Sequence, residues 1–335
     1  MKQHAVNTSM MLGILIVAVS MTPAGQSRSS NAADGMTQAQ QDRWKTELSN
    51  WGRWGASDEV GALNLITPAK RRAAAALVTE GFSVSLARQA ETEKAADNAN
   101  PYQHEMLSIS SDRISIAFHG QAHTHLDALS HTYIDGKAYN GYAPTRDEVM
   151  QRGRHSRNSI EKVKDGIFTR GVLIDLPRLK GVPYLDAGTP IFVEDLEAWE
   201  KLAGVTVGEG DALFVRTGRW VQRARTGAWR VGTGADSIRA GLHPSTLPWL
   251  KRRNIALLGG DIPQSFNPGG TAAPLAHAVH QFAPTILGVH LFDNVDLEAL
   301  AEAAAARKRW TFLLTAAPLP IVGATGSPIN PIATF

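Results

Sequence analysis

Three short apolar runs constrain the fold more than any other feature of this sequence. They are Gly171 to Asp175, Ala212 to Val215 and Ile255 to Leu258, and each meets a polar residue or a glycine at its ends. Runs of this length that are apolar throughout are typical of strands buried on both faces of a sheet. Such strands need helices that cover them, so the sequence predicts an α/β fold.

Helical and further strand patterns accompany these runs. Thr67 and Pro68 form an N-cap and first-turn pair that predicts a helix as far as Thr79, before Gly81. Other expected helices are Phe192 to Ala203 and Leu297 to Arg309, and other expected strands are Phe82 to Ala87, Arg113 to Phe118 and Trp310 to Leu314. The mixture continues without a break in composition and without an internal repeat, which favours one catalytic domain.

Composition limits the chemistry. The 335 residues include no cysteine, so disulfides, thiolate nucleophiles and cysteine-based zinc sites are excluded. Any bound metal must take histidine, carboxylate, amide or water ligands. The net charge is +3, but Lys and Arg are spread along the chain rather than gathered in a block with aromatic residues, so nucleic-acid binding is not expected.

The N-terminus predicts export. A short polar start at Lys2 and His4 precedes the apolar run Met10 to Met21, and small residues near Ala24 suit cleavage. The run is shorter than the about 20 apolar residues that cross a bilayer, and no later segment is apolar enough for a span. We therefore expect a periplasmic or secreted protein. The expected segments are a signal peptide over 1–24, a disordered leader over 25–41 and the catalytic domain over 42–335.

The segment from His119 to His131 predicts a metal site. If the strand that begins near Arg113 continues, its alternation places one row of polar side chains on a single face. The row consists of His119, Gln121, His123, His125 and Asp127. Imidazole and carboxylate groups suit a divalent ion such as zinc or manganese. Hydrogen bonding among surface histidines is the plainer alternative, and the sequence alone does not say which histidines bind.

The same segment resembles the HxGTHxDxPxH signature of the cyclase-like metal-dependent hydrolases, the family of bacterial kynurenine formamidases and isatin hydrolase. Thr124, His125, Asp127 and His131 match that signature. Gln121 stands where its first histidine belongs, and His123 and Leu129 replace its glycine and proline. The resemblance implies His125 and Asp127 as ligands, with the first position open to Gln121, His119 or His123. It implies one divalent ion, zinc or manganese, and leaves a second metal open.

Resemblance extends downstream. Gly171 to Pro177 and Gly210 to Gly218 look like the family's central strands, and Leu258 to Pro263 looks like its Gly-x-Asp-x-Pro turn. His280 resembles a histidine that a Glu or Gln follows about a dozen residues later to complete the site. Here that second group is Asp293, with a shorter side chain and a longer spacing. His277 and His290 are rival candidates, and Asp293 could instead cap a helix that begins at Asp296.

These residues predict hydrolysis by a metal-activated water. His131 is the candidate general acid or base, and His280 is the second candidate catalytic histidine. Trp51, Trp54 and Phe118 are candidate walls of a substrate pocket. Arg216, at the end of an expected strand, is a candidate for binding a substrate carboxylate, or else part of a structural ion pair.

The resemblance implies a single α/β domain with a central mixed, partly barrel-like sheet of the swivelling β/β/α type, flanked by helices and assembled as a homodimer or homotetramer. It also implies a small substrate with an amide, cyclic imide or lactone bond. The rival class is a non-catalytic periplasmic protein that binds a metal or ligand. A serine hydrolase would need a G-x-S-x-G turn, and the sequence has none.

Overall fold

The computed structural model describes Met1 and residues 37–230, 237–269 and 278–335. Except for Met1, these all belong to one compact unit, Asp34–Phe335. The predicted signal peptide therefore lies outside the described residues, as does His277. Within the described part of the chain, no helix is both long and apolar enough to cross a membrane.

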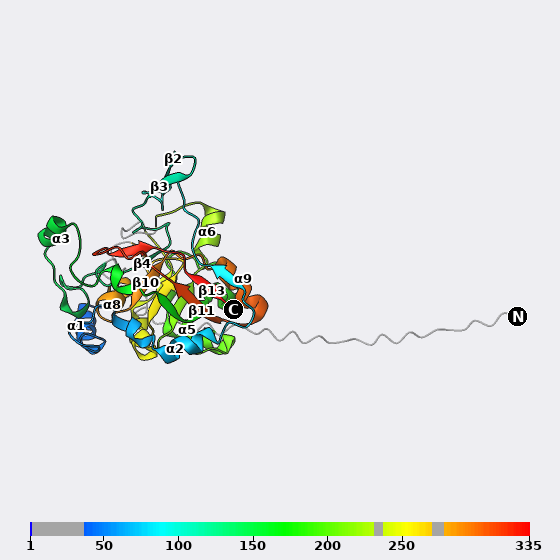
Figure 1. Cartoon of the computed structure of the whole chain (residues 1–335). Coiled ribbons are helices and arrows are strands. Elements are labelled where there is room, and N and C mark those ends of the chain that lie inside the picture. Colours follow the sequence, from blue (N-terminus) through cyan, green and yellow to red (C-terminus); the bar gives the residue numbers. More distant parts are fainter. Residues whose placement is uncertain (2–36, 231–236, 270–277) are drawn as a thin grey trace. The chain divides into compact units, whose positions relative to one another are not determined.

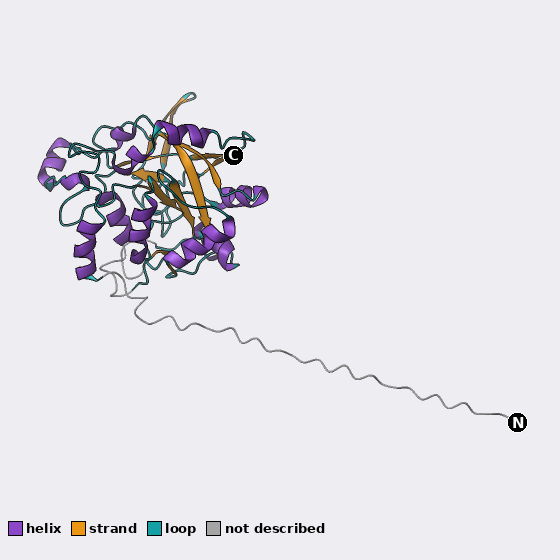
Figure 2. Ribbon diagram, turned by 90° about the horizontal axis from the view of Figure 1, so that it is seen from below, coloured by secondary structure: helices purple, strands orange, loops and turns teal. Residues whose placement is uncertain are grey.

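A nine-stranded sheet forms the centre of this unit, in the order β1-β13-β11-β5-β7-β9-β10-β4-β12. Strands β5, β7, β9 and β10 are parallel neighbours, whereas the strands outside them pair antiparallel. The sheet is thus mixed, and it curls into a half-barrel flanked by helices (Figures 1 and 2). This confirms the predicted fold class. The strands are β1 Ser83–Ser85, β4 His125–Asp127, β5 Ile167–Asp175, β7 Ala212–Arg216, β9 Leu257–Gly260, β10 His290–Asp293, β11 Thr311–Ala316, β12 Gly326–Pro328 and β13 Ile332–Thr334.

Alternation along the central strands explains why both faces are covered. In β7, Leu213 and Val215 join one apolar cluster, whereas Ala212 and Phe214 join another on the opposite face. The first cluster packs against α5 Val193–Ala203, α7 Leu247–Arg253 and α8 Ala278–Thr285. The second packs against α9 Glu298–Arg307. Two of the apolar runs predicted as buried strands lie within β5 and β7, and the third overlaps the start of β9, at Leu257 and Leu258.

The predicted helices also form, with small shifts at their ends. Thr67 Oγ1 accepts a hydrogen bond from the Lys70 amide at 3.2 Å and caps α2, Pro68–Ala75, which ends before the expected Thr79. Gly204, at φ 63°, ends α5 in the left-handed conformation that glycine adopts at low cost. Residues 38–41, expected in the disordered leader, begin helix α1, Gln38–Glu47. The remaining elements are α3 Arg146–Arg152, α4 Leu176–Lys180, α6 Arg219–Thr226, η2 Gly61–Leu65, η3 Tyr139–Gly141, η4 Ile160–Val163, η5 Pro244–Thr246, β2 Gln103–Ser108, β3 Ser111–Ser115, β6 Pro190–Ile191 and β8 Gly241–Leu242.

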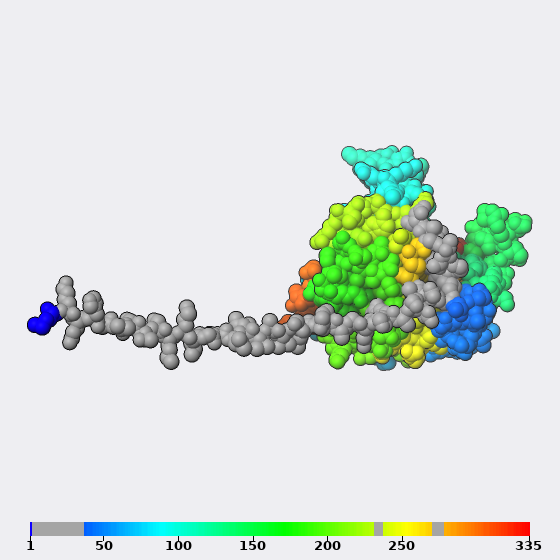
Figure 3. Space-filling model, turned by 180° about the vertical axis from the view of Figure 1, so that it is seen from behind, coloured from blue at the N-terminus to red at the C-terminus, as the bar shows by residue number. Residues whose placement is uncertain are grey.

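One strand prediction is wrong. The strand near Arg113 does not continue to Asp127, because β3 ends at Ser115 and pairs only with β2, in a two-stranded hairpin separate from the main sheet. All residues of β2 and β3 are exposed, and the hairpin stands out from the rest of the unit (Figure 3). The side chains of β3 therefore face water instead of a core. Residues 116–124 contain no strand, and pairing resumes only at β4.

Gly171 provides a test of the packing between strands. It pairs directly with Phe312 across β5 and β11, and a Cβ at this position would overlap the Phe312 ring. We expect Gly171→Ala to lower the free energy of unfolding by about 1–3 kcal/mol, as overpacking does in well-packed cores. Urea denaturation measures this change in the free energy of unfolding. The control Gly208→Ala places its Cβ 3.8 Å from the nearest atom, on Arg170, and should change stability by less than about 0.5 kcal/mol. Equal stability of the two variants would contradict this account of the sheet.

Candidate metal centre

Strand pairing brings the candidate ligands to one face of the sheet. β4 lies between β10 and β12, with His125 opposite Asp293 and Asp127 opposite Leu291. Alternate residues of a strand share a face, so His125, Asp127 and Asp293 project to the same side as Leu291. Leu291 belongs to the cluster covered by α8, the helix that carries His280. The sheet and α8 thus enclose the site between them.

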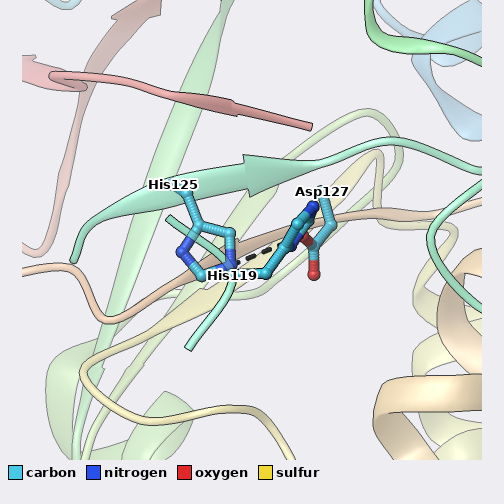
Figure 4. A group of neighbouring side chains, drawn as sticks. All are labelled: His119, His125 and Asp127. Atoms are coloured by element: carbon cyan, nitrogen blue, oxygen red, sulfur yellow. Dashed lines mark ion pairs between the residues drawn. The ribbon is translucent and has the colours of Figure 1, made fainter. Parts of the chain in front are cut away.

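Asp127 lies at the centre of this site and is fully buried. Its Oδ1 atom is 3.1 Å from His119 Nδ1 and 3.4 Å from His125 Nε2 (Figure 4). Its Oδ2 atom is 3.6 Å from His131 Nε2 and 3.5 Å from His280 Nε2. The carboxylate is therefore shared by two groups of potential metal ligands, His119 with His125 and His131 with His280.

Neighbouring groups orient the imidazoles. His125 Nδ1 donates to the carbonyl of His123 at 2.8 Å, which leaves Nε2 directed towards Asp127. His119 Nε2 is 2.8 Å from Thr325 Oγ1, which leaves Nδ1 on the side of Asp127. The ring of His119 also stacks on His131, with centroids 4.1 Å apart and planes at 9°.

His280 and Asp293 lie side by side, as the family resemblance implied despite the longer spacing. His280 Nε2 lies 2.9 Å from Asp293 Oδ2, and the His280 amide donates to Ser265 Oγ at 2.9 Å. Asp293 lies in β10 and therefore does not cap the next helix, which begins at Glu298 after Leu297. The second carboxylate thus joins the group around Asp127.

The donor set fits a divalent cation. Both oxygens of Asp127, Oδ1 of Asp293 and Nδ1 of His119 are buried and have no hydrogen-bond partner among the described residues. Buried polar atoms without a partner cost free energy, and a bound ion would satisfy them. Imidazole nitrogens with carboxylate oxygens are the ligands that zinc and manganese take in a site without cysteine.

The charges of the site lead to the same conclusion. Burial acts to raise the pKa of Asp127, but His131 and His125 outweigh it and hold that pKa well below its usual value, so the carboxylate is ionised. Burial acts to lower the pKa of His125, yet Asp127 raises it to about 9. Without a metal, the site therefore holds a proton on His125. A metal cation would take over this positive charge and release the proton.

The predicted ligands differ in where they lie. His119 stands beside His125 and Asp127, at the position left open because Gln121 replaces the first histidine of the signature. Gln121 lines a cavity next to His119. His123 is buried away from Asp127, with Nε2 3.1 Å from the Asn100 carbonyl and its ring edge-on to Tyr102.

The candidate substrate residues also separate. Phe118 lies against His119 and His125, with ring centroids 4.4 and 5.7 Å apart. The Trp51 indole donates to the Thr285 carbonyl at 2.6 Å, and Trp54 lies under Arg53, so both have packing roles in this structure.

Arg216 forms the structural ion pair that was the alternative to carboxylate binding. Its Nη1 is 2.7 Å from Asp175 Oδ1, and its Nη2 is 2.6 Å from Glu298 Oε2. Its neighbour Val215 belongs to the cluster on the side of Asp127, so Arg216 projects to the opposite face, where α9 lies. Arg216 is therefore held on the other side of the sheet from the site.

Comparison with known proteins identifies the family. The family model described as "Putative cyclase" matches residues 50–265, more than half of the chain. A crystal structure of a novel cyclase is 31% identical, covers 86% of this chain and all of its own, and superposes with a TM-score of 0.74. The chain therefore belongs to the cyclase family.

Two further relatives have known names. Kynurenine formamidase of Geobacillus thermodenitrificans is 28% identical over 105 residues, which are 31% of this chain and 44% of that protein. The chain thus matches less than half the length of this relative. Isatin hydrolase A from Ralstonia solanacearum shares the fold, with a TM-score of 0.51, 20% identity and coverage of 75% of this chain and 91% of that chain.

The choice between His119 and Gln121 can be tested by metal affinity. We expect His119→Ala to weaken zinc binding at least about tenfold, because removing even an indirect partner of a metal ligand has that effect. Gln121→Ala should leave the affinity nearly unchanged. Competition with a chromophoric chelator measures both. The reverse order of the two variants would show that the amide takes the ligand position.

His290 predicts a pH dependence of stability. It is fully buried in β10, and burial lowers its pKa from 6.5 to about 4. As pH falls below about 6.5, the unfolded chain takes up a proton that the folded chain refuses until about pH 4, so stability decreases through this window. We expect the loss of unfolding free energy between pH 7 and 5 to be smaller in His290→Gln than in the wild type. Urea denaturation at the two pH values compares them, and identical losses would contradict the prediction.

Proposed function

We propose that this protein is a metal-dependent hydrolase that opens an amide, cyclic imide or lactone bond in a small substrate. The observation that carries the proposal is the buried Asp127 carboxylate, whose two oxygens lie between two pairs of histidines without a hydrogen-bond partner among the described residues. The names of the relatives support the reaction class, since kynurenine formamidase and isatin hydrolase are both hydrolases.

His119, His125 and Asp127 would hold the ion. A divalent ion there would polarise a substrate carbonyl and lower the pKa of water to near neutrality. The half-exposed edge of the site is formed by His119 and His131, whose side chains are 30% and 26% exposed. A substrate can therefore approach from this edge, where the water and the carbonyl must meet.

His131 is the residue we assign to proton transfer. Burial lowers its pKa to about 4, partly offset by Asp127, so the imidazole is neutral at neutral pH and can accept a proton on Nε2. It would then return that proton to the leaving nitrogen or oxygen. His280 is held by Asp293, and burial, which lowers its pKa, is outweighed by that carboxylate, so its pKa is raised and it carries a proton more readily than His131.

The same geometry also suits His131 and His280 as ligands of a second ion, together with Asp127. The two roles differ in metal content. As a proton carrier, His131 can be replaced by Ala with loss of turnover but no loss of bound metal. As a ligand, its replacement lowers the number of metal ions per chain, which inductively coupled plasma mass spectrometry counts.

Reconstitution tests the proposal as a whole. We expect chelator-treated protein to be inactive towards a formyl-aniline and a simple lactone, and to regain hydrolysis of at least one when zinc or manganese is returned. Asp127→Ala should lose metal and reduce turnover by at least about a hundredfold, because the ion stabilises the transition state by several kcal/mol. The control is His104→Ala, which removes an exposed histidine paired with Asp112 in the hairpin.

Two results would contradict the proposal. One is full turnover in metal-free protein or in Asp127→Ala. The other is stable metal binding with no hydrolysis of any amide, imide or lactone tried, which would favour the non-catalytic metal-binding protein instead.

A further inference from the structure

A cavity of about 160 Å³ adjoins the candidate metal centre. His119 forms part of its wall and is also the residue whose Nδ1 lies 3.1 Å from Asp127 Oδ1. The cavity is thus one imidazole ring away from the shared carboxylate. Engineered cavities of about 150 Å³ hold a benzene molecule, so this one has room for a single aromatic ring or a group of similar size.

Hydrogen bonds within the protein hold another part of the cavity wall in place. His123 donates from Nε2 to the Asn100 carbonyl at 3.1 Å and so ties the loop at 98–100 to the segment that precedes β4. The side-chain amide of Asn98 donates from Nδ2 to the carbonyl of Glu93 at 2.8 Å, which holds the same loop at a second point. Both residues line the cavity and are buried, so this part of its wall is held in place within the protein, whereas Asn100 and Arg230 line it from exposed positions.

The charge of this wall favours an anion. Asp97 lines the cavity, but its carboxylate is paired with Arg219 at 3.3 Å and with Arg223 at 2.6 Å, which also binds Glu91. Arg230 also lines the cavity, and among the described residues it has no hydrogen-bond or ion-pair partner. Arg230 is exposed, so water hydrates its guanidinium in the free protein, and this group is available to an anion that enters the cavity.

We propose that Arg230 binds a carboxylate of the substrate in this cavity, which makes the substrate a small acylated acid, such as an N-acyl aromatic acid, instead of a neutral amide. The inference rests on the proposed function for the reacting bond and adds the group that is recognised. The carboxylate would lie against Arg230, and the ring or chain that bears it would fill the cavity. The scissile carbonyl would then lie beyond His119, at the metal centre.

Binding of small probes tests the subsite without any turnover. Ligand-observed NMR titrations compare benzoate with benzamide, its uncharged analogue, on the full-length protein with and without added zinc. We expect benzoate to bind at least about tenfold more tightly, as charge-assisted hydrogen bonds do, and to do so in the absence of zinc. Arg230→Gln should lose this preference.

The matched control is Arg225→Gln. It removes the same charge from the last turn of α6, where Arg225 lies over Tyr184 and does not line the cavity. This variant should retain the preference for benzoate. Equal affinity for the two probes in the wild type, or wild-type benzoate binding in Arg230→Gln, would overturn the proposal.

Kinetics separates the subsite from the reaction. On zinc-loaded enzyme, Arg230→Gln should raise KM for 2-formamidobenzoate about tenfold at unchanged kcat, and leave KM for formanilide within about twofold. If both substrates turn over and Arg230→Gln changes neither KM, the subsite proposal is wrong and the hydrolase proposal is supported. Arg230-dependent benzoate binding with no turnover of either substrate would support the subsite and count against the proposed reaction.

Discussion

The antiparallel pairing of β4 with β10 determines where the carboxylate of Asp127 lies, and the rest of the site depends on that position. The pairing places Asp127 and His125 opposite Leu291 and Asp293 on a fully buried part of the sheet. A carboxylate buried there needs compensation for the hydration it has lost. The four histidines around Asp127 provide it in part through their protons, but leave both oxygens without a hydrogen bond. A divalent ion completes the compensation, which is why the pairing and the chemistry cannot be separated.

The ionised groups on the two faces of the sheet have different roles. On the face away from the site, Arg216 forms ion pairs with Asp175 and Glu298, and these pairs join β5, β7 and α9. On the face of Asp127, the carboxylates face imidazoles, which can lose a proton near neutral pH. Guanidinium groups stay charged at any physiological pH and could not be displaced by a metal. Arg239 is a permanent cation close to Asp293, and its Nε donates to the Ser265 carbonyl at 2.7 Å, so the exchangeable positive charge of the site belongs to its imidazoles.

Sequence alone predicted most of the fold and the centre of the site, for physical reasons that can be named. Buried strands and capped helices have local signatures, so β5, β7, β9, α2 and α5 were found within a few residues. His125, Asp127 and His131 were found because a short motif lies largely on one short strand and the turn after it.

His119 could not be chosen over Gln121, because the argument from alternation assumed a strand through 116–124 that does not form. The turn that replaces it brings His119 back to Asp127, and its ring is then held by Thr325, some two hundred residues later. Arg230 gave no signal, since nothing in the sequence links it to the 96–100 loop. Export and assembly into oligomers stay predictions.

Asp127 is buried and Arg230 is exposed, and the proposed substrate would lie between them. Among the described residues the oxygens of Asp127 have no hydrogen bond and Arg230 has no carboxylate partner, and His119 both lies beside Asp127 and lines the cavity. A metal ion at Asp127 and a guanidinium at Arg230 favour a ligand whose reacting carbonyl oxygen faces the ion and whose carboxylate faces the guanidinium. In the reverse orientation the carboxylate would occupy the ion's open position, which the reacting carbonyl needs, so that complex would be unproductive. Binding of the carboxylate at Arg230 would therefore set the direction in which a small acid binds productively.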